Sequence, residues 1–300
     1  MSYKLAINTG FAVNRYPLAE EWIDLVANKL EVKYVQFTSD LLNPYLPEKI
    51  YFKEAENIQK LISKNDLIIN STFTGAFTRL NHLGHPDENI QNYWINWFKK
   101  FIDFSVLVNA ESMGSHLGIM SALENKDPNL RKKRLDKVIK NWHVIGDYAQ
   151  KKGLKFLSWE PMSIGREFGQ TINECEIIQK KLNNNTPIPF KICLDVDHGD
   201  SSSKNPRDTN PYEWIKYFSK DICYLHLKQS IKNKLGHWPF IKKYNEEGKI
   251  NPNKIVNLMN SLSMSNIPLI LELSFKEREP YDSLVEEQVR ESVEYWKRFI

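Results

Sequence analysis

Eight short segments of apolar, β-forming residues alternate with longer amphipathic segments from one end of this chain to the other. The apolar segments comprise residues 4–8, 32–37, 66–71, 111–118, 154–160, 189–195, 223–228 and 268–273. Helical periodicity occupies the intervals and the last part of the chain, near residues 19–30, 47–63, 88–109, 129–151, 170–183, 210–219, 251–261 and 281–299. Strands that alternate with helices usually pair in parallel. We therefore predict an α/β fold, a single (β/α)8 barrel that forms one domain over residues 1–300.

The main alternative to a barrel is an open, doubly wound parallel sheet. Such a sheet usually carries a glycine-rich phosphate loop after its first strand. The corresponding segment here, INTGFAV, lacks the GxGxxG spacing, which favours the closed barrel. Four aromatic residues stand at helical spacing within residues 88–109, and we interpret them as core packing. They are Trp94, Trp97, Phe98 and Phe101.

Composition and charge argue against several classes of function. The net charge of +4 over 300 residues is small for a nucleic-acid surface, whereas it suits an anionic small molecule. No segment approaches the ~20 apolar residues that a membrane helix requires, and we see no secretory signal. The three cysteines form no CxxC pair, and Cys193 and Cys223 lie in apolar segments. We therefore expect reduced, buried thiols in a cytoplasmic protein that has no nucleic-acid or membrane partner.

Four residues able to bind a metal stand at the ends of the last four apolar segments. They are Glu160 in LKFLSWEP, Asp195 in FKICLDVDH, His226 in CYLHLKQ and Glu272 in PLILELSF. Taken singly, an acidic residue at a strand end is more often a helix cap, and a histidine in a strand is more often a core residue. Parallel strands, however, would gather all four side chains at one end of the barrel. Three carboxylates buried there would require a cation.

The donor set indicates the kind of cation. Carboxylate oxygens with one imidazole suit Mn²⁺, Mg²⁺, Co²⁺ or Fe²⁺ better than they suit a closed thiolate zinc site. We expect one divalent metal ion, Mn²⁺ first, with Mg²⁺ or Co²⁺ as the alternatives. A metal beside two carboxylates can move protons on an oxygen-rich substrate.

Other polar residues near these strand ends are candidates for contacts with the metal or the substrate. His198 follows Asp195 by three residues and is predicted to face the substrate. Asp197 shares a strand face with Asp195, as an alternate ligand or as a hydrogen-bond acceptor next to the ligands. His116 ends the fourth apolar segment, where it has either a sugar-binding or a structural role.

The segments around the candidate ligands resemble the xylose isomerase-like TIM-barrel superfamily, and within it the tagatose and psicose 3-epimerases. The shared motifs are Trp159-Glu160-Pro161, Leu194-Asp195-x-x-His198, His226-Leu227-Lys228-Gln229 and Leu271-Glu272-Leu273. The resemblance covers essentially the whole chain. It implies that Glu160, Asp195, His226 and Glu272 bind the metal. It also implies that Glu160 and Glu272 act as acid and base, and that His198 contacts substrate oxygens.

Three further segments resemble bacterial erythrulose phosphate epimerases of polyol catabolism. These are NTGFAVNRYP (8–17), STFTG (71–75) and HWPF (237–240). Where the free-sugar epimerases carry an arginine, this chain has Lys232, which argues against a free hexose as the substrate. Lys228, Lys232 and His237 would hold a phosphate or a carboxylate, or alternatively form a solvated basic loop. We also place Asn8 among the substrate-binding residues.

The expected function is that of a divalent-metal-dependent epimerase acting on a short ketose or ketose phosphate in carbohydrate metabolism. An aldose–ketose isomerase and a 3-oxo sugar acid decarboxylase are alternatives, because both would use the same metal site. A nucleic-acid endonuclease with this barrel and a non-catalytic sugar-binding module are the remaining alternatives. We expect a small sugar or sugar phosphate as the binding partner, and a homodimer or homotetramer as the assembly.

Overall fold

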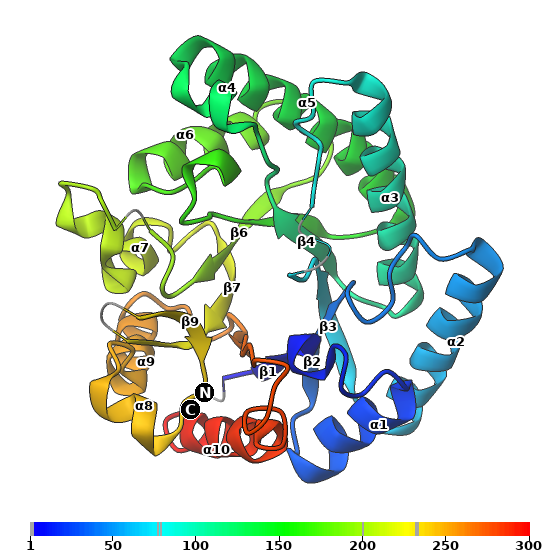
Figure 1. Cartoon of the computed structure of the whole chain (residues 1–300), viewed down its shortest axis with the longest axis vertical. Helices are drawn as coiled ribbons and strands as arrows, with labels where there is room; N and C mark the ends of the chain where they lie inside the picture. The colour runs from blue at the N-terminus through cyan, green and yellow to red at the C-terminus, as the bar shows by residue number, and fades with distance from the viewer. Residues whose placement is uncertain (1–2, 77, 79, 200, 232–233) are drawn as a thin grey trace.

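Eight parallel strands close into a barrel, which confirms the predicted (β/α)8 fold (Figure 1). The computed structural model describes residues 3–76, 78, 80–199, 201–231 and 234–300. The barrel strands are β1 (Leu5–Asn8), β2 (Tyr34–Thr38), β3 (Ile68–Phe73), β4 (Ser112–His116), β5 (Phe156–Glu160), β6 (Phe190–Asp195), β7 (Ile222–Leu227) and β10 (Leu269–Leu271). Strand β1 pairs in parallel with both β2 and β10, and these two pairings close the barrel.

Helices surround the strands on all sides, and both termini lie close to α8 and α10 (Figure 1). The helices at the predicted positions are α1 (Ala19–Asp24), α2 (Glu48–Lys64), α3 (Glu88–Leu107), α5 (Pro128–Lys152), α6 (Ile172–Leu182), α7 (Pro211–Tyr217), α9 (Pro252–Ser261) and α10 (Val285–Lys297). Sequence periodicity did not reveal the short helices α4 (Ala122–Lys126) and α8 (Lys242–Glu247). Among the described residues, no helix has the length and apolar character needed to cross a membrane.

Side-chain caps mark where the two longest helices begin. Helix α3 starts after Asp87, whose side chain accepts a hydrogen bond from the backbone N–H of Asn89. Helix α5 starts after Asp127 in the same way and ends at Gly153, which adopts the left-handed conformation with φ of 91°. Such caps satisfy backbone groups that have no partner inside the helix. Helices α2 and α10 begin without a side-chain cap.

The core has two layers. The larger lies between the barrel and the helices and contains the aromatic cluster predicted on α3, where Trp97 and Phe98 are fully buried. The smaller includes inward-facing strand residues and fills the barrel below the ligand positions. It consists of Ala6, Phe73, Phe156, Cys193, Cys223, Tyr224 and Ile270. Side chains alternate along a strand, so Cys193, Tyr224 and Ile270 share a face with the residue two positions further on. We call this smaller cluster the barrel plug.

The sequence analysis missed a short hairpin that follows β7. Strands β8 (Gln229–Ile231) and β9 (Lys234–Trp238) pair antiparallel outside the barrel. Strand β8 has only three residues, Gln-Ser-Ile, and all three are buried. Its sequence therefore does not show the alternation of polar and apolar residues that marks a half-exposed strand. The hairpin places His237 next to the strand ends that carry the candidate ligands.

Candidate functional site

Four barrel strands bring the predicted metal ligands together at one end of the barrel. Glu160 and Asp195 are the last residues of β5 and β6, His226 lies one residue before the end of β7, and Glu272 directly follows β10. Parallel strands present their carboxyl ends at the same face, and one donor atom from each residue lies within 4.8 Å of the other three. Asp195 and His226 are fully buried.

The imidazole ring of His226 contacts both glutamates through one nitrogen. Its Nδ1 atom lies 3.2 Å from Glu160 Oε1 and 3.3 Å from Glu272 Oε2. Burial alone would raise the pKa of Glu272, but His226 and His237 outweigh it and hold this pKa well below its ordinary value. Glu272 is therefore an anion in the folded protein, in a state that can bind a cation or accept a proton.

A series of hydrogen bonds determines which nitrogen of His226 carries a proton. The backbone N–H of Gly10, which can only donate, lies 2.7 Å from Asn8 Oδ1. The amide nitrogen of Asn8 must then be the group that donates to Gln36 Oε1, at 2.8 Å. The same Gln36 oxygen lies 2.8 Å from His226 Nε2, so Nε2 is the donor. In the neutral ring, Nδ1 therefore keeps a lone pair that faces the two glutamates.

These residues fit a divalent cation. A lone pair on His226 Nδ1 facing two carboxylate oxygens is repulsive unless a second proton or a cation lies between them. Asp195 Oδ2 pairs with Lys228 Nζ at 2.9 Å, and Glu272 Oε2 lies 3.3 Å from both His226 Nδ1 and His237 Nδ1. Three carboxylates still face one lysine and the imidazoles in a buried site, and one divalent cation would balance their remaining charge and satisfy the imidazole. Three carboxylates with one imidazole suit Mn²⁺, Mg²⁺ or Co²⁺.

A second group of polar residues surrounds Asp195. Lys228 Nζ lies 2.9 Å from Asp195 Oδ2 and 3.1 Å from His237 Nε2, and His198 Nε2 lies 3.8 Å from the same aspartate oxygen. Burial opposes the charge of Asp195, but His198, Lys228 and His237 overcome it and lower its pKa. Burial likewise opposes the charge of Lys228, yet Asp195 and Glu272 raise its pKa. Lys228 therefore balances the charge of Asp195 inside the site.

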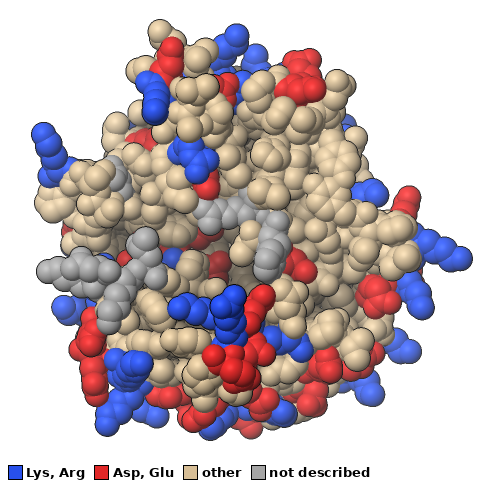
Figure 2. All heavy atoms as spheres, viewed as in Figure 1, with Lys and Arg blue, Asp and Glu red and all other residues tan. Residues whose placement is uncertain are grey.

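Glu160 and Glu272 line a cavity of about 770 Å³, and the buried Asp195 and His226 lie next to them. Figure 2 shows this face of the molecule hollowed at its centre, with acidic side chains inside the hollow and on part of its rim. Four of the predicted substrate-binding residues line the cavity: Asn8, His116, His198 and His237. A volume of this size accommodates a small sugar phosphate. The contacts of these four residues with a substrate stay predictions.

Two of the predicted basic residues are placed differently. Lys228 is buried against Asp195 and is absent from the lining of the cavity, so this geometry does not favour a direct contact with a substrate phosphate. Lys232 lies outside the described residues. Asp197 is paired with Lys249, 3.7 Å away, and its backbone N–H donates to Asp195 Oδ1. Asp197 therefore supports the ligand Asp195 through its backbone rather than its carboxylate.

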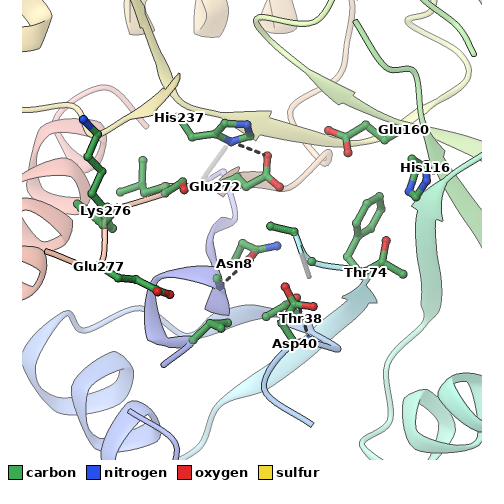
Figure 3. A pocket seen from close by; sticks show the side chains of 18 of the residues that line it. Asn8, Thr38, Asp40, Thr74, His116, Glu160, His237, Glu272, Lys276 and Glu277 are labelled. Atoms are coloured by element: carbon green, nitrogen blue, oxygen red, sulfur yellow. Dashed lines mark hydrogen bonds and ion pairs between the residues drawn. The ribbon is translucent and has the colours of Figure 1, made fainter. Parts of the chain in front are cut away.

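The sequence analysis did not identify residues on the other side of the cavity. Gln36 in β2 holds the ring of His226 but is a neutral residue inside an apolar segment. Thr38 and Asp40 line the cavity near Gly75 (Figure 3). A Cβ atom on Gly75 would collide with the side chains of both, so glycine is needed where the loop after β3 passes over them. No charge pattern in the sequence marks these neutral and loop positions.

The chain matches known proteins over nearly its full length. The family model described as xylose isomerase-like TIM barrel matches residues 25–299. A D-erythrulose 1-phosphate 3-epimerase from Brucella abortus (strain 2308) is 36% identical over 297 residues, which cover 99% of this chain and 96% of that relative.

Solved structures show the same fold. A crystal structure from Rhodospirillum rubrum ATCC 11170 superposes with a TM-score of 0.91 at 24% identity, over 100% of both chains. A D-psicose 3-epimerase with D-tagatose, from Clostridium cellulolyticum H10, superposes with a TM-score of 0.71 at 12% identity, over 99% of both chains. At these identities the superpositions establish the architecture of the barrel and leave its chemistry to the residues described above.

Proposed function

Because the chain belongs to the xylose isomerase-like TIM-barrel family, we propose that it is a metal-dependent 3-epimerase of a short ketose phosphate, with D-erythrulose 1-phosphate as the reference substrate. The 36% identity to an epimerase of that substrate supports this choice. The observation that carries the mechanism is that Glu160 and Glu272 both reach His226 Nδ1, with one oxygen at 3.2 Å and one at 3.3 Å from it.

Glu160, Asp195, His226 and Glu272 would hold the divalent metal, Mn²⁺ by preference and Mg²⁺ or Co²⁺ as alternatives. A bound divalent ion of this kind polarises a ketone and the neighbouring hydroxyl, which makes the C–H between them more acidic. The pairing of Lys228 with Asp195, at 2.9 Å, keeps this carboxylate anionic and in place. Gln36 keeps the ring of His226 oriented.

Two carboxylates are what inversion at C3 requires. One glutamate would remove the C3 proton, and the electron pair of the broken C–H bond would form the double bond of an enediolate. The other glutamate, which must enter the reaction in its protonated form, would then give its proton to C3 from the opposite face, which restores the ketone with inverted configuration. A single base would return the proton to the face from which it came. We assign these roles to Glu160 and Glu272 in either order.

The remaining lining residues would orient the substrate. His198 lies 3.6 Å from Glu160 Oε1, and its Nδ1 lies 2.9 Å from the backbone oxygen of Pro161. With its position fixed in this way, Nε2 is available to contact a substrate oxygen. His116 at the end of β4 and Asn8 at the end of β1 face the same cavity, and we propose that they bind hydroxyl groups.

The proposal extends to the organisation of the protein. The barrel strands run from Leu5 to Leu271 and α10 packs beyond them, which supports one catalytic domain over residues 1–300. We propose a cytoplasmic enzyme of carbohydrate metabolism that assembles as a homodimer or homotetramer. Light scattering would determine the size of this assembly.

Solvent exchange tests the reaction directly. The protein is incubated in D₂O with D-erythrulose 1-phosphate and Mn²⁺, and deuterium incorporation is located by NMR. We expect deuterium at C3 together with appearance of the other epimer. Unphosphorylated D-erythrulose is tested in parallel, because the phosphate ester on C1 of the first substrate prevents formation of an aldehyde there. Label at C1 of erythrulose with an aldose product would instead indicate an isomerase, and CO₂ release from a 3-oxo sugar acid without ketose exchange would indicate a decarboxylase. Either result would refute the epimerase proposal.

A further inference from the structure

We propose that the substrate phosphate binds at one end of the cavity, where Arg15, Lys276 and Arg278 line it, an inference that rests on the function proposed above. These are the lysine and arginine residues among the described residues that line the cavity. Two of them follow β10 on the segment that also carries Glu272, and Arg15 lies on the segment after β1. The ligand is the phosphate of a phosphorylated ketose, a dianion that basic side chains recognise.

Arg15 is a largely buried cation that lines this end of the cavity. Its side chain is only 8% exposed, and its Nε lies 2.6 Å from Asp282 Oδ1. One terminal nitrogen donates to the backbone oxygen of Lys276 at 3.0 Å. The guanidinium is thus fixed between two segments that are distant in sequence. The N–H groups of the guanidinium that make neither contact remain available to a phosphate oxygen.

Lys276 and Arg278 add mobile positive charge beside it. Lys276 follows Glu272 by four residues, so the two Cα atoms lie within about 14 Å of each other even in an extended chain. Figure 3 places Lys276 on the side of Glu272 away from Glu160. A phosphate on C1 would therefore lie close to these side chains while C3 lies between the glutamates.

The opposite end of the cavity has the opposite character. Thr38, Asp40 and Thr74 lie on the far side of Asn8 and Glu272 from Lys276 (Figure 3). Asp40 Oδ1 accepts a hydrogen bond from the backbone N–H of Thr78 at 2.8 Å, which holds the carboxylate in place. A carboxylate repels a phosphate and accepts a hydrogen bond from a hydroxyl. The charge difference between the ends therefore directs C1 toward Arg15 and the C4 hydroxyl toward Asp40.

Among the described residues that line the cavity, Glu277 is the acidic residue at the basic end. It provides a second test of the phosphate site. Glu277 lines the cavity between Lys276 and Arg278, and its Oε1 accepts a hydrogen bond from Asn14 at 2.6 Å. Its charge would weaken phosphate binding. Removal of this charge and removal of the neighbouring positive charges should therefore have opposite effects on the affinity for a phosphorylated substrate.

The experiment compares D-erythrulose 1-phosphate with unphosphorylated D-erythrulose, using C3 deuterium exchange as the rate. We expect the Lys276→Ala/Arg278→Ala double variant to raise KM for the phosphorylated ketose at least about tenfold. Its kcat for that substrate should change by less than about threefold. Glu277→Gln should lower the same KM. Where erythrulose exchange is too slow to measure, its inhibition constant against the phosphorylated ketose replaces KM.

Lys132→Ala/Lys133→Ala is the matched control, because it removes the same charge from exposed positions on α5. It should leave both substrates unaffected. An equal loss on erythrulose and its phosphate in the Lys276/Arg278 variant would overturn the proposal, as would an unchanged KM for the phosphate. If the unmodified protein exchanges C3 of neither ketose, the proposed function itself fails, and the two failures are thereby distinguished.

Discussion

The two halves of the barrel mouth carry different chemistry. Strands β5, β6, β7 and β10 end in charged or metal-binding residues, three carboxylates and one imidazole, whose donor atoms lie within 4.8 Å of one another. Strands β1 and β2 instead contribute the neutral amides of Asn8 and Gln36, and β3 and β4 contribute hydroxyl groups and His116. We call these the charged half and the neutral half.

The difference shows how a cation site can be both charged and ordered. Buried charges need a partner ion, and the three carboxylates of the charged half face Lys228 and histidines whose charge depends on their protonation. Buried amides need only hydrogen bonds, which the neutral half supplies in full from Gly10 N–H through to His226 Nε2. The charged half would therefore bind the metal and move protons, while the neutral half determines the orientation of the histidine ligand.

Removal of the metal should produce the largest effect, because it leaves the charged half with unpaired carboxylates. We expect dialysis against a chelator to reduce C3 exchange to background, and added Mn²⁺ to restore it. Metal at a hundredfold excess over Kd should stabilise the folded state by about 2.7 kcal/mol, measured as a rise in Tm. Full activity after chelation, with metal analysis showing an empty protein, would contradict the proposed site.

Glu160→Gln and Glu272→Gln should each lower kcat by about 10³-fold or more, since each removes one of the two proton-transfer groups. The amide keeps the shape of the side chain. Isothermal titration with Mn²⁺ serves as the control, because it shows whether a variant that has lost activity still binds metal. Near-normal turnover in either variant would eliminate the two-carboxylate scheme.

Gln36→Leu tests whether the neutral half affects metal binding by orienting the candidate ligand His226. We expect metal affinity to fall about 10- to 100-fold, because His226 Nε2 loses the acceptor that orients the ring. Gln36→Glu keeps an acceptor oxygen and should bind metal more tightly than the leucine variant. The measurement is titration calorimetry with Mn²⁺, with Tm of the metal-free proteins as a check on folding. Equal affinities for the original protein and Gln36→Leu would show that the two halves are independent.

Thr74→Val should have the smallest effect. The change removes a hydroxyl that lies 3.0 Å from Ser115 Oγ in a buried pair, away from the candidate ligands. We expect urea unfolding to show a loss of about 1 kcal/mol and kcat to fall less than about tenfold. A loss of activity as large as that of the glutamate variants would mean that the neutral half takes part in the chemical step.

The sequence predicted the barrel and the charged half more fully than the neutral half, for a physical reason. An ionisable residue that ends an apolar segment, as in Glu160 and Asp195, contrasts with its neighbours. Gln36 lies within the apolar segment YVQFT, where an amide is compatible with an ordinary half-buried strand. Its importance appears only when β2 and β7 face each other across the barrel.

The basic end of the cavity was also beyond the reach of sequence. Arg15 donates to the backbone of Lys276, and 261 residues separate the two. No local pattern reports such a contact, since it depends on β1 and β10 being neighbours in the closed barrel. From the sequence, we instead assigned anion binding to basic residues on one loop, among them Lys228, with a solvated basic loop as the alternative. The burial of Lys228 against Asp195 could not be foreseen from spacing alone.

The barrel plug has a consequence for how substrate enters the cavity and how product leaves it. Phe156, Tyr224 and Ile270 pack beneath the ligand residues, so among the described residues the barrel interior is a packed core rather than a pore. Both epimers must then enter and leave through the same opening of the cavity, at the carboxyl ends of the strands. Each epimer should behave as a purely competitive inhibitor of the other's conversion. A bound epimer must leave before another molecule can enter the cavity.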